Sequence, residues 1–239
     1  PASPQRRNPS THAHAASITQ SPRSLDRMIW ALHGMVGDPA DWDFLRPSLP
    51  GLQTPLLWAE VDRYTPWAFQ FAKKVRAADP RPILLGYSMG GRLALHALLA
   101  APDLFRAAII VSAHTGLADR EMRKLRWRQD DDWAKKLRSL SWETFLRIWN
   151  DQVVFDGVNM PGERLTTFKW RQGIIRSFDC WGLSRQEDLL PKLGHLSLPI
   201  LWVSGGKDTR YTELARDAVA ALPNARHDII PDAGHRVPW

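Results

Sequence analysis

A serine between two glycines is the residue pattern in this chain that most directly predicts chemistry. Gly86-Tyr87-Ser88-Met89-Gly90 follows a short apolar run, Ile83–Leu85, and a helical pattern begins directly after it. Such a G-x-S-x-G turn between a strand and a helix is a nucleophile elbow, because only glycine leaves room for the tight turn and the serine side chain is left accessible. The N–H groups at the start of the helix then face any negative charge that develops beside Ser88. We therefore predict that Ser88 is a catalytic serine.

A serine hydroxyl needs a histidine to take its proton and a carboxylate to orient that histidine. Downstream of the elbow, Asp208 ends the segment Ser204–Asp208 and His235 ends the segment Pro231–His235, each directly after a predicted strand. The carboxyl ends of parallel strands meet at one edge of a sheet, which is where such proteins bind ligands. Asp208 as a simple helix N-cap is the alternative reading. Asp232 is a weaker rival for the acid, because it lies too near His235 in sequence to reach the ring easily.

Two backbone N–H groups are candidates for an oxyanion hole beside the serine. Met89 follows the serine directly, and Met35 follows the His33-Gly34 turn at the end of the first predicted strand. His33 itself is expected to shape this loop, and His114, at the end of another strand, is a candidate pocket residue. The chain has no histidine and carboxylate pair at metal-ligand spacing and no phosphate-binding glycine motif, so we expect neither a metal nor a cofactor.

These residues require a sheet that brings strand ends together, and the chain has the pattern for one. Apolar runs alternate with helical patterns, which predicts an α/β fold with a mostly parallel sheet and helices on both faces. The expected strands are Arg27–Leu32, Leu56–Glu60, Pro82–Gly86, Ala107–Ser112, Pro199–Ser204 and Ala225–Ile230. The expected helices are Asp41–Leu49, Pro66–Ala78, Met89–Ala101 and Thr212–Ala221.

The alternation stops after His114 and resumes near the end of the chain. Residues 116–194 have helical patterns rich in Arg, Lys and Trp, so we expect a helical lid inserted between two parts of a core, 27–115 and 195–239. Residues 1–26 are rich in Pro, Ser, Thr and Ala, and such a segment buries too little apolar surface to fold. We expect a disordered N-terminal extension there.

Composition narrows the class of protein. The chain has 239 residues, 44% of them hydrophobic and 24% charged, with one cysteine and no long apolar segment. These features predict a cytoplasmic protein without a disulfide framework or membrane insertion. The net charge of +7 is compatible with nucleic-acid binding, but the basic residues are scattered and no nucleic-acid-binding motif accompanies them. A small anionic substrate explains the charge as well, and the sequence does not indicate an oligomeric state.

Over residues 27–239 the chain resembles the α/β-hydrolase superfamily in its elbow, its helical insertion, and its GGKD and AGH loops. More narrowly it resembles the 2-succinyl-6-hydroxy-2,4-cyclohexadiene-1-carboxylate synthases of menaquinone biosynthesis. Five segments carry that resemblance: the elbow extended to Arg92, then Arg126–Ala134, Trp149–Phe155, Gln186–Leu189 and Gly205–Tyr211. In one respect the chain departs from the superfamily, because it ends at Trp239 where a final helix normally follows. We therefore expect less support for the loop of His235.

The resemblance implies a reaction and a binding site. Members of that family eliminate pyruvate from an enolpyruvyl cyclohexene carboxylate, with the serine acting as a base and without an acyl-enzyme. Arg92 and Arg126 then correspond to clamps for the substrate carboxylates, and Tyr87 and Trp149 shape the pocket. Arg171 is a further candidate on its charge and position in the lid alone, since arginine binds carboxylates through two parallel hydrogen bonds.

Three other functions compete with the synthase. A serine hydrolase acting on an ester, thioester or C–C bond would use Ser88, Asp208 and His235 through an acyl-enzyme, and would not need Arg92. A binding protein with the same fold would not need the complete set of catalytic residues. Nucleic-acid binding through the basic lid predicts a steep salt dependence of affinity and tolerance of Ser88→Ala.

Overall fold

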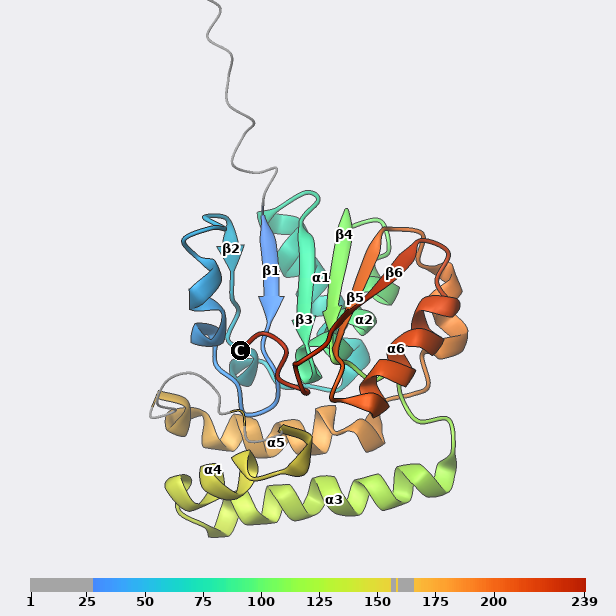
Figure 1. Ribbon diagram of the computed structural model, residues 1–239. Coiled ribbons are helices and arrows are strands. Elements are labelled where there is room, and N and C mark those ends of the chain that lie inside the picture. The colour runs from blue at the N-terminus through green and yellow to red at the C-terminus, as the bar shows by residue number, and fades with distance from the viewer. Residues whose placement is uncertain (1–27, 156–157, 159–165) are drawn as a thin grey trace, which may run out of the picture.

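A six-stranded parallel sheet forms the centre of the molecule in the computed structural model, which describes residues 28–155, 158 and 166–239 (Figure 1). The expected extension, 1–26, lies outside the described residues. The strands stand in the order β2-β1-β3-β4-β5-β6, so the chain starts one strand from an edge, adds the edge strand β2 and then crosses to the other edge. Their bounds are Ile29–Leu32 for β1, Leu52–Gln53 for β2, Ile83–Tyr87 for β3, Ala107–Val111 for β4, Ile200–Gly205 for β5 and Ala225–Ile230 for β6.

The apolar runs form strands because successive side chains point to opposite faces of the sheet and both faces are covered. In β3, Leu84 belongs to the larger hydrophobic core, whereas Leu85 and Tyr87 belong to a smaller core on the other face. Parallel pairing aligns Leu32 at the end of β1 with Gly86 of the elbow. The loop after β1 therefore starts beside the elbow serine.

Helices α1 (Tyr64–Ala78) and α2 (Met89–Ala100) cover the face of the larger core, and they pack against each other behind the sheet in Figure 1. Helix α6 (Thr209–Ala220) contributes Ala215 and Ala218 to the same core. Trp67, Phe71 and Val75 recur at helical spacing on the buried side of α1. That spacing places one apolar stripe against the sheet, as expected for a surface helix.

The opposite face is covered by shorter elements. The 3₁₀ helix η2 (Pro39–Leu45) places Trp42 on this face, and the last residues of the chain bring Trp239 to it. The ring centroids of Trp42 and Trp239 lie 6.4 Å apart, and those of Tyr87 and Trp239 lie 5.1 Å apart. The C-terminal residues that follow His235 therefore pack onto the sheet, beside β3.

One expected strand is wrong. Leu56–Glu60 forms no strand: it contains the 3₁₀ helix η3 (Leu57–Ala59), and the edge strand is the two-residue β2. Leu57 and Trp58 are buried as the pattern suggests, but the Leu57 backbone N–H and the Trp58 indole N–H do not bind a neighbouring strand. The Leu57 N–H donates to His33 Nε2 at 3.4 Å and the Trp58 indole N–H donates to the Gly37 carbonyl at 2.9 Å. A short apolar run indicates burial without deciding between strand and helix.

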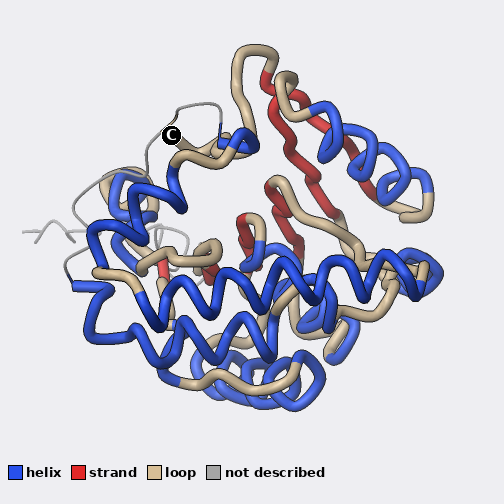
Figure 2. The backbone as a smooth tube through the Cα atoms, turned by 90° about the horizontal axis from the view of Figure 1, so that it is seen from below, coloured by secondary structure: helices blue, strands red, loops and turns tan. Residues whose placement is uncertain are grey.

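Between β4 and β5 the chain forms a separate helical layer. It contains α3 (Arg120–Ser139), α4 (Trp142–Asn150), α5 (Arg171–Trp181) and the 3₁₀ helices η4 (Val153–Phe155), η5 (Thr166–Trp170) and η6 (Leu183–Arg185). The 3₁₀ helix η7 (Leu190–His195) follows them and packs against α2 and α6 of the core. Figure 1 shows α3, α4 and α5 together below the sheet, and Figure 2 views this layer from below.

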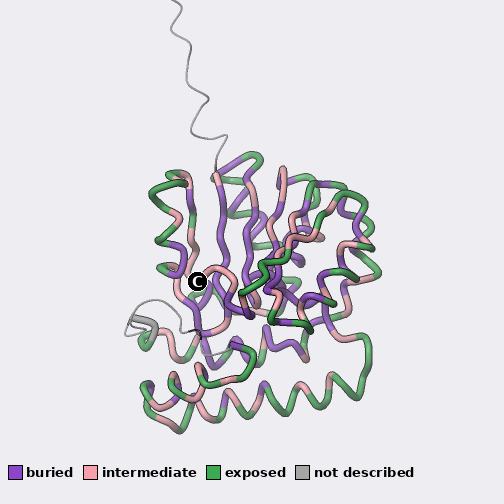
Figure 3. Tube along the Cα trace, in the orientation of Figure 1, coloured by how far each residue is buried: buried purple, intermediate pink, exposed green. Residues whose placement is uncertain are grey.

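Helix α3 has few buried residues, and Figure 3 shows exposed and half-exposed positions along its length. Its charged residues are largely a solvated surface. Within the described part of the chain, no helix has the length and apolar character needed to cross a membrane.

Candidate active site

The elbow at Ser88 has a backbone that depends on its glycines. Ser88 lies between β3 and α2 with φ 52° and ψ −111°, a left-handed conformation that costs energy for a residue with a side chain. A Cβ added to Gly86 would lie 2.5 Å from the Gly90 carbonyl oxygen, and one added to Gly90 would lie 2.1 Å from the Leu32 carbonyl oxygen. The two glycines let β1, β3 and α2 approach closely enough to hold Ser88 in this turn.

Ser88, His235 and Asp208 lie in one hydrogen-bonded row. His235 Nε2 is 3.0 Å from Ser88 Oγ, and His235 Nδ1 is 2.7 Å from Asp208 Oδ2. His235 and Asp208 are buried, at 3% and 9% exposure. The carboxylate accepts a hydrogen bond from Nδ1–H, which keeps the proton on Nδ1 and leaves the lone pair of Nε2 directed at the serine hydroxyl. This arrangement can remove a proton from Ser88, or from a substrate through Ser88.

The loops that carry Asp208 and His235 are tied to each other. The Gly206 N–H donates to the Ile230 carbonyl at 2.8 Å, and the Lys207 N–H donates to the Ala233 carbonyl at 3.0 Å. Asp208 is also the N-cap of α6, because Oδ1 accepts a hydrogen bond from the Tyr211 N–H at 3.4 Å. Asp208 therefore has both of the roles considered for it, since Oδ2 binds His235 and Oδ1 caps α6.

The rival acid does not take part in this row. Asp232 is exposed, and the carboxylate on His235 is that of Asp208. The Tyr211 ring packs on His235 with 4.3 Å between the ring centroids. Tyr211 therefore restricts the tilt of the imidazole from α6.

Met89 and Met35 are placed beside the elbow by neighbouring strands. Met89 is the first residue of α2, so its N–H lies among the groups that have no acceptor within the helix. Met35 lies in the loop after β1, next to Val36 with its positive φ of 59°. The hydroxyl of Ser177, in α5, donates to Met35 Sδ at 3.1 Å. This contact joins the helical layer to the loop after β1.

Tyr87 and Trp149 reach the surroundings of His235 from opposite sides. The Tyr87 ring is buried, with its centroid 5.7 Å from that of His235, and burial raises the pKa of Tyr87 so that its hydroxyl stays protonated. Trp149, in α4, packs 5.9 Å from Phe155, whose ring lies 6.1 Å from that of His235. An aromatic row therefore runs from the helical layer to the histidine.

Arg92 is buried between the core and the helical layer. Its Nη1 donates to the Trp181 carbonyl at 2.7 Å and also to the Tyr64 hydroxyl. Burial raises the pKa of Tyr64 to about 12, so this hydroxyl remains neutral beside the guanidinium. Arg92 lies one helical turn after Ser88, as the sequence indicates. Its Nη1 atom links α5, through the Trp181 carbonyl, to α1, through Tyr64.

The two arginines predicted in the lid have different surroundings. Arg126 Nε donates to Asp130 Oδ1 at 2.8 Å, and the other oxygen of Asp130 accepts from the N–H and hydroxyl of Ser184. The guanidinium of Arg171 donates to the carbonyls of Leu137 and Leu140, at the end of α3. Arg171 therefore binds the backbone at the end of α3.

Sequence reasoning missed Arg236, the neighbour of His235. This residue is 2% exposed, and its guanidinium carbon lies 3.7 Å above the Phe155 ring centroid. Nη2 donates to Asn150 Oδ1 at 2.6 Å, and Nη1 donates to the Val158 carbonyl. Arg236 thus joins the loop of His235 to the helical layer. The signal was a cation directly after His235 in the otherwise apolar tail Val237–Trp239.

His114, at the end of β4, makes hydrogen bonds that hold the neighbouring backbone in place. Its Nδ1 accepts a hydrogen bond from the Gly116 N–H at 3.0 Å, and its carbonyl accepts one from Gln186 Nε2 at 3.1 Å. Burial lowers the pKa of His114 to about 3, so its ring is neutral at pH 7. Among the described residues, no cluster of three or more His, Cys, Asp or Glu side chains is arranged to hold a metal ion.

Comparison with known proteins identifies the family of the chain and supports the fold. A family model described as the alpha/beta hydrolase family matches residues 21–239. A protein of Haemophilus influenzae, named a putative 2-succinyl-6-hydroxy-2,4-cyclohexadiene-1-carboxylate synthase, is 30% identical over an alignment of 223 residues that covers 85% of this chain and 88% of that protein. The synthase of Serratia proteamaculans is 28% identical over 87% of this chain and 85% of its own length.

Among solved structures, MenH from S. aureus has a similar fold. It matches with a TM-score of 0.75 and 18% identity over 88% of this chain and 87% of that one.

Proposed function

The chain belongs to the alpha/beta hydrolase family, and from that premise we propose that this enzyme eliminates pyruvate from an enolpyruvyl cyclohexene carboxylate. The reaction is that of a 2-succinyl-6-hydroxy-2,4-cyclohexadiene-1-carboxylate synthase, the activity for which the relatives in Haemophilus influenzae and Serratia proteamaculans are named. The observation that carries the proposal is the row Asp208–His235–Ser88, with its hydrogen bonds of 2.7 Å and 3.0 Å. Such a row supplies a base in a buried site.

In the proposed mechanism Ser88 is a proton acceptor. His235 draws the hydroxyl proton of Ser88, and Ser88 Oγ removes the ring proton α to the ketone of the substrate. The electron pair of that C–H bond forms an enolate, which the N–H groups of Met35 and Met89 stabilise. The enolate then expels the enolpyruvyl oxygen by breaking its bond to the ring, and protonation of the leaving enolate yields pyruvate. Ser88 forms no covalent bond to the substrate.

A substrate with several carboxylates needs cationic partners, and Arg92 and Arg126 are the ones we assign. Arg92 uses Nη1 for its hydrogen bonds to Tyr64 and Trp181, and we assign Nη2 and Nε to a substrate carboxylate. Arg126 is paired with Asp130 but remains 32% exposed. Tyr87 and Trp149 shape the apolar part of the pocket. We assign Arg171 to the support of α3, because its hydrogen bonds go to the backbone there.

Release of pyruvate from the enolpyruvyl substrate, measured beside hydrolysis of p-nitrophenyl acetate, tests this function. We expect pyruvate from the wild type, and losses of activity in Ser88→Ala and in Arg92→Met. Arg76→Met is the matched control, since Arg76 is an exposed residue in the last turn of α1. Rapid ester turnover with a covalent adduct at Ser88 and no release of pyruvate would favour a serine hydrolase and refute the synthase.

A further inference from the structure

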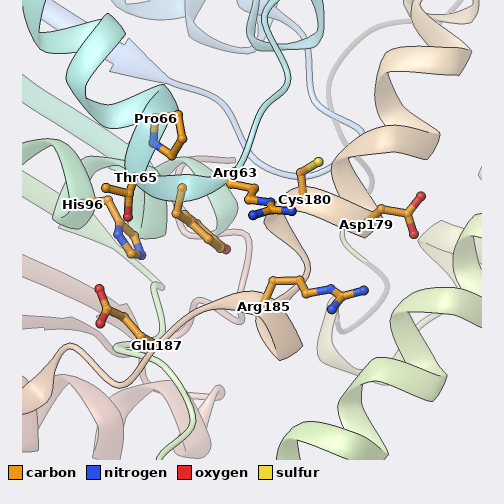
Figure 4. Close-up of a pocket in the computed structure, with 9 residues that line it drawn as sticks. Arg63, Thr65, Pro66, His96, Asp179, Cys180, Arg185 and Glu187 are labelled. Atoms are coloured by element: carbon orange, nitrogen blue, oxygen red, sulfur yellow. The ribbon is translucent and has the colours of Figure 1, made fainter.

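A cleft lies between the core and the helical layer, away from the row at Ser88. Its volume is about 720 Å³, and it is lined by Arg63, Tyr64, Thr65, Pro66 and His96 of the core and by Asp179, Cys180, Arg185 and Glu187 of the layer. Figure 4 shows the core residues on one side of it and Arg185 and Glu187 on the other. Ser88, Asp208 and His235 are not among the residues that line it.

The cleft contains the N-terminus of a long helix. Helix α1 has 15 residues and begins at Tyr64, with Arg63 at the N-cap and no side chain accepting from its first turn. The free N–H groups of the first turn give this end of the helix a partial positive charge that attracts anions. Pro66 has no N–H, so the available backbone donors are those of Tyr64 and Thr65.

Two arginines at the cleft have no partner, whereas its carboxylates do. Within the described part of the chain, no acceptor or carboxylate pairs with the guanidinium of Arg63 or Arg185. Asp179 is paired with Arg138 at 3.6 Å, and Glu187 is paired with Lys192 at 2.5 Å. Both carboxylates therefore have cations of their own outside the set of residues that line the cleft. The two free guanidiniums make this a site for negative charge.

A buried histidine provides an independent sign of a ligand. His96 is 6% exposed, and its Nε2 atom has no hydrogen-bond partner. Its ring stacks on Tyr64 with 4.3 Å between the centroids, and Figure 4 shows it at the wall of the cleft, turned toward Glu187. Buried polar atoms are normally paired, so an unpaired one in a cavity wall points to a group that binds there. Burial lowers the pKa of His96 to about 4, which keeps the ring neutral.

The cleft continues into an apolar cavity. A second cavity of about 480 Å³ shares Thr65, His96 and Glu187 with the first. Beyond them its wall is formed by Ala68, Phe69, Leu99 and Ala100, with Lys192 and His195 at its edge. Phe69 is 58% exposed. Such a large exposed aromatic side chain beside a charged cleft is suited to the apolar part of a ligand.

We propose that this cleft is a second binding site, for a small amphiphilic anion. Its carboxylate or phosphate group lies at the N-terminus of α1 between Arg63 and Arg185, and its apolar part extends past His96 to Phe69. A ligand in this position contacts both the core and the helical layer. The site shares no residue with the row at Ser88, although Tyr64 in its wall accepts a hydrogen bond from Arg92.

Calorimetric titration with hexyl phosphate, hexanoate, inorganic phosphate and hexylammonium tests the site on the full chain. We expect both hexyl anions to bind, inorganic phosphate to bind more weakly and hexylammonium not to bind. The double variant Arg63→Gln/Arg185→Gln should weaken hexyl phosphate at least tenfold, since hydrogen bonds to a charged group are lost. Stronger binding of one anion identifies carboxylate or phosphate as the natural group.

Two matched variants complete the design. Arg76→Gln/Arg176→Gln removes the same charge from exposed positions of α1 and α5 outside the cleft, and we expect it to bind hexyl phosphate within twofold of the wild type. Phe69→Ala should weaken hexyl phosphate but leave inorganic phosphate unchanged. The proposal is overturned if neither hexyl anion binds at millimolar concentration, if hexylammonium binds as tightly, or if both arginine pairs have equal effects. Pyruvate release does not enter into any of these measurements.

Discussion

Asp208→Asn removes the negative charge of the acid but keeps the size and shape of the side chain. In the wild type, Asp208 Oδ2 lies 2.7 Å from His235 Nδ1 in a buried site, so Nδ1 carries the proton and Nε2 accepts from Ser88. An asparagine amide that donates to Nδ1 reverses this: Nε2 then carries the proton and can no longer act as a base. Loss of the carboxylate in such a row lowers kcat by about 10⁴. At 1.36 kcal/mol per factor of ten, that is about 5 kcal/mol of transition-state stabilisation.

The assay has two readouts that do not share a substrate. Pyruvate release reports the proposed reaction, and the rate at which an organophosphonate labels Ser88 reports activation of the serine alone. We expect both to fall by about 10³–10⁴ in Asp208→Asn. Asp232→Asn is the matched control, because this exposed carboxylate lies in the loop of His235 and should leave both rates within twofold. Labelling of Asp208→Asn at the wild-type rate would refute the assignment of Asp208 as the orienting acid.

Three further predictions concern Arg236, Arg171 and His96. Arg236→Met should lower the free energy of unfolding by about 2–4 kcal/mol, because two partly buried oxygens of the helical layer lose their donor. It should also slow labelling of Ser88 at least tenfold, and a folded variant with an unchanged rate would contradict the link to His235. Arg171→Met should cost about 1–3 kcal/mol in urea unfolding while the KM for pyruvate release stays within twofold; a large rise in KM would return Arg171 to the substrate site. His96 has a folded pKa of about 4 against 6.5 in the unfolded chain, so the unfolded state binds its proton first and stability falls as the pH drops from 6.5 to 4. Urea unfolding of His96→Gln across that range should show a loss smaller by about 3 kcal/mol, and equal pH profiles would exclude a neutral buried imidazole.

The elbow shows why part of the site can be read without a structure. Gly86 and Gly90 are required by local sterics, and a strand followed at once by a helix is visible in the pattern of apolar residues. The order serine, acid, histidine along the chain then selects Asp208 and His235 from loops that follow strands. The error at Leu56–Glu60 has the opposite origin. Its apolar residues are buried, but their hydrogen-bond partners, His33 and Gly37, belong to another loop.

The sequence by itself determined the alternation of strands and helices, the inserted helical segment and the three residue types of the row at Ser88. These follow from local rules: the side-chain periods of strands and helices, the sterics of glycine and the proton chemistry of each group. The partners of Arg92, Arg171 and Arg236 were decided only by the tertiary structure. Arg92 donates to the Trp181 carbonyl, Arg171 donates to carbonyls at the end of α3, and Arg236 donates to Asn150. A guanidinium at the end of a long side chain binds whichever acceptor the fold brings within reach, and that acceptor lies far away in sequence.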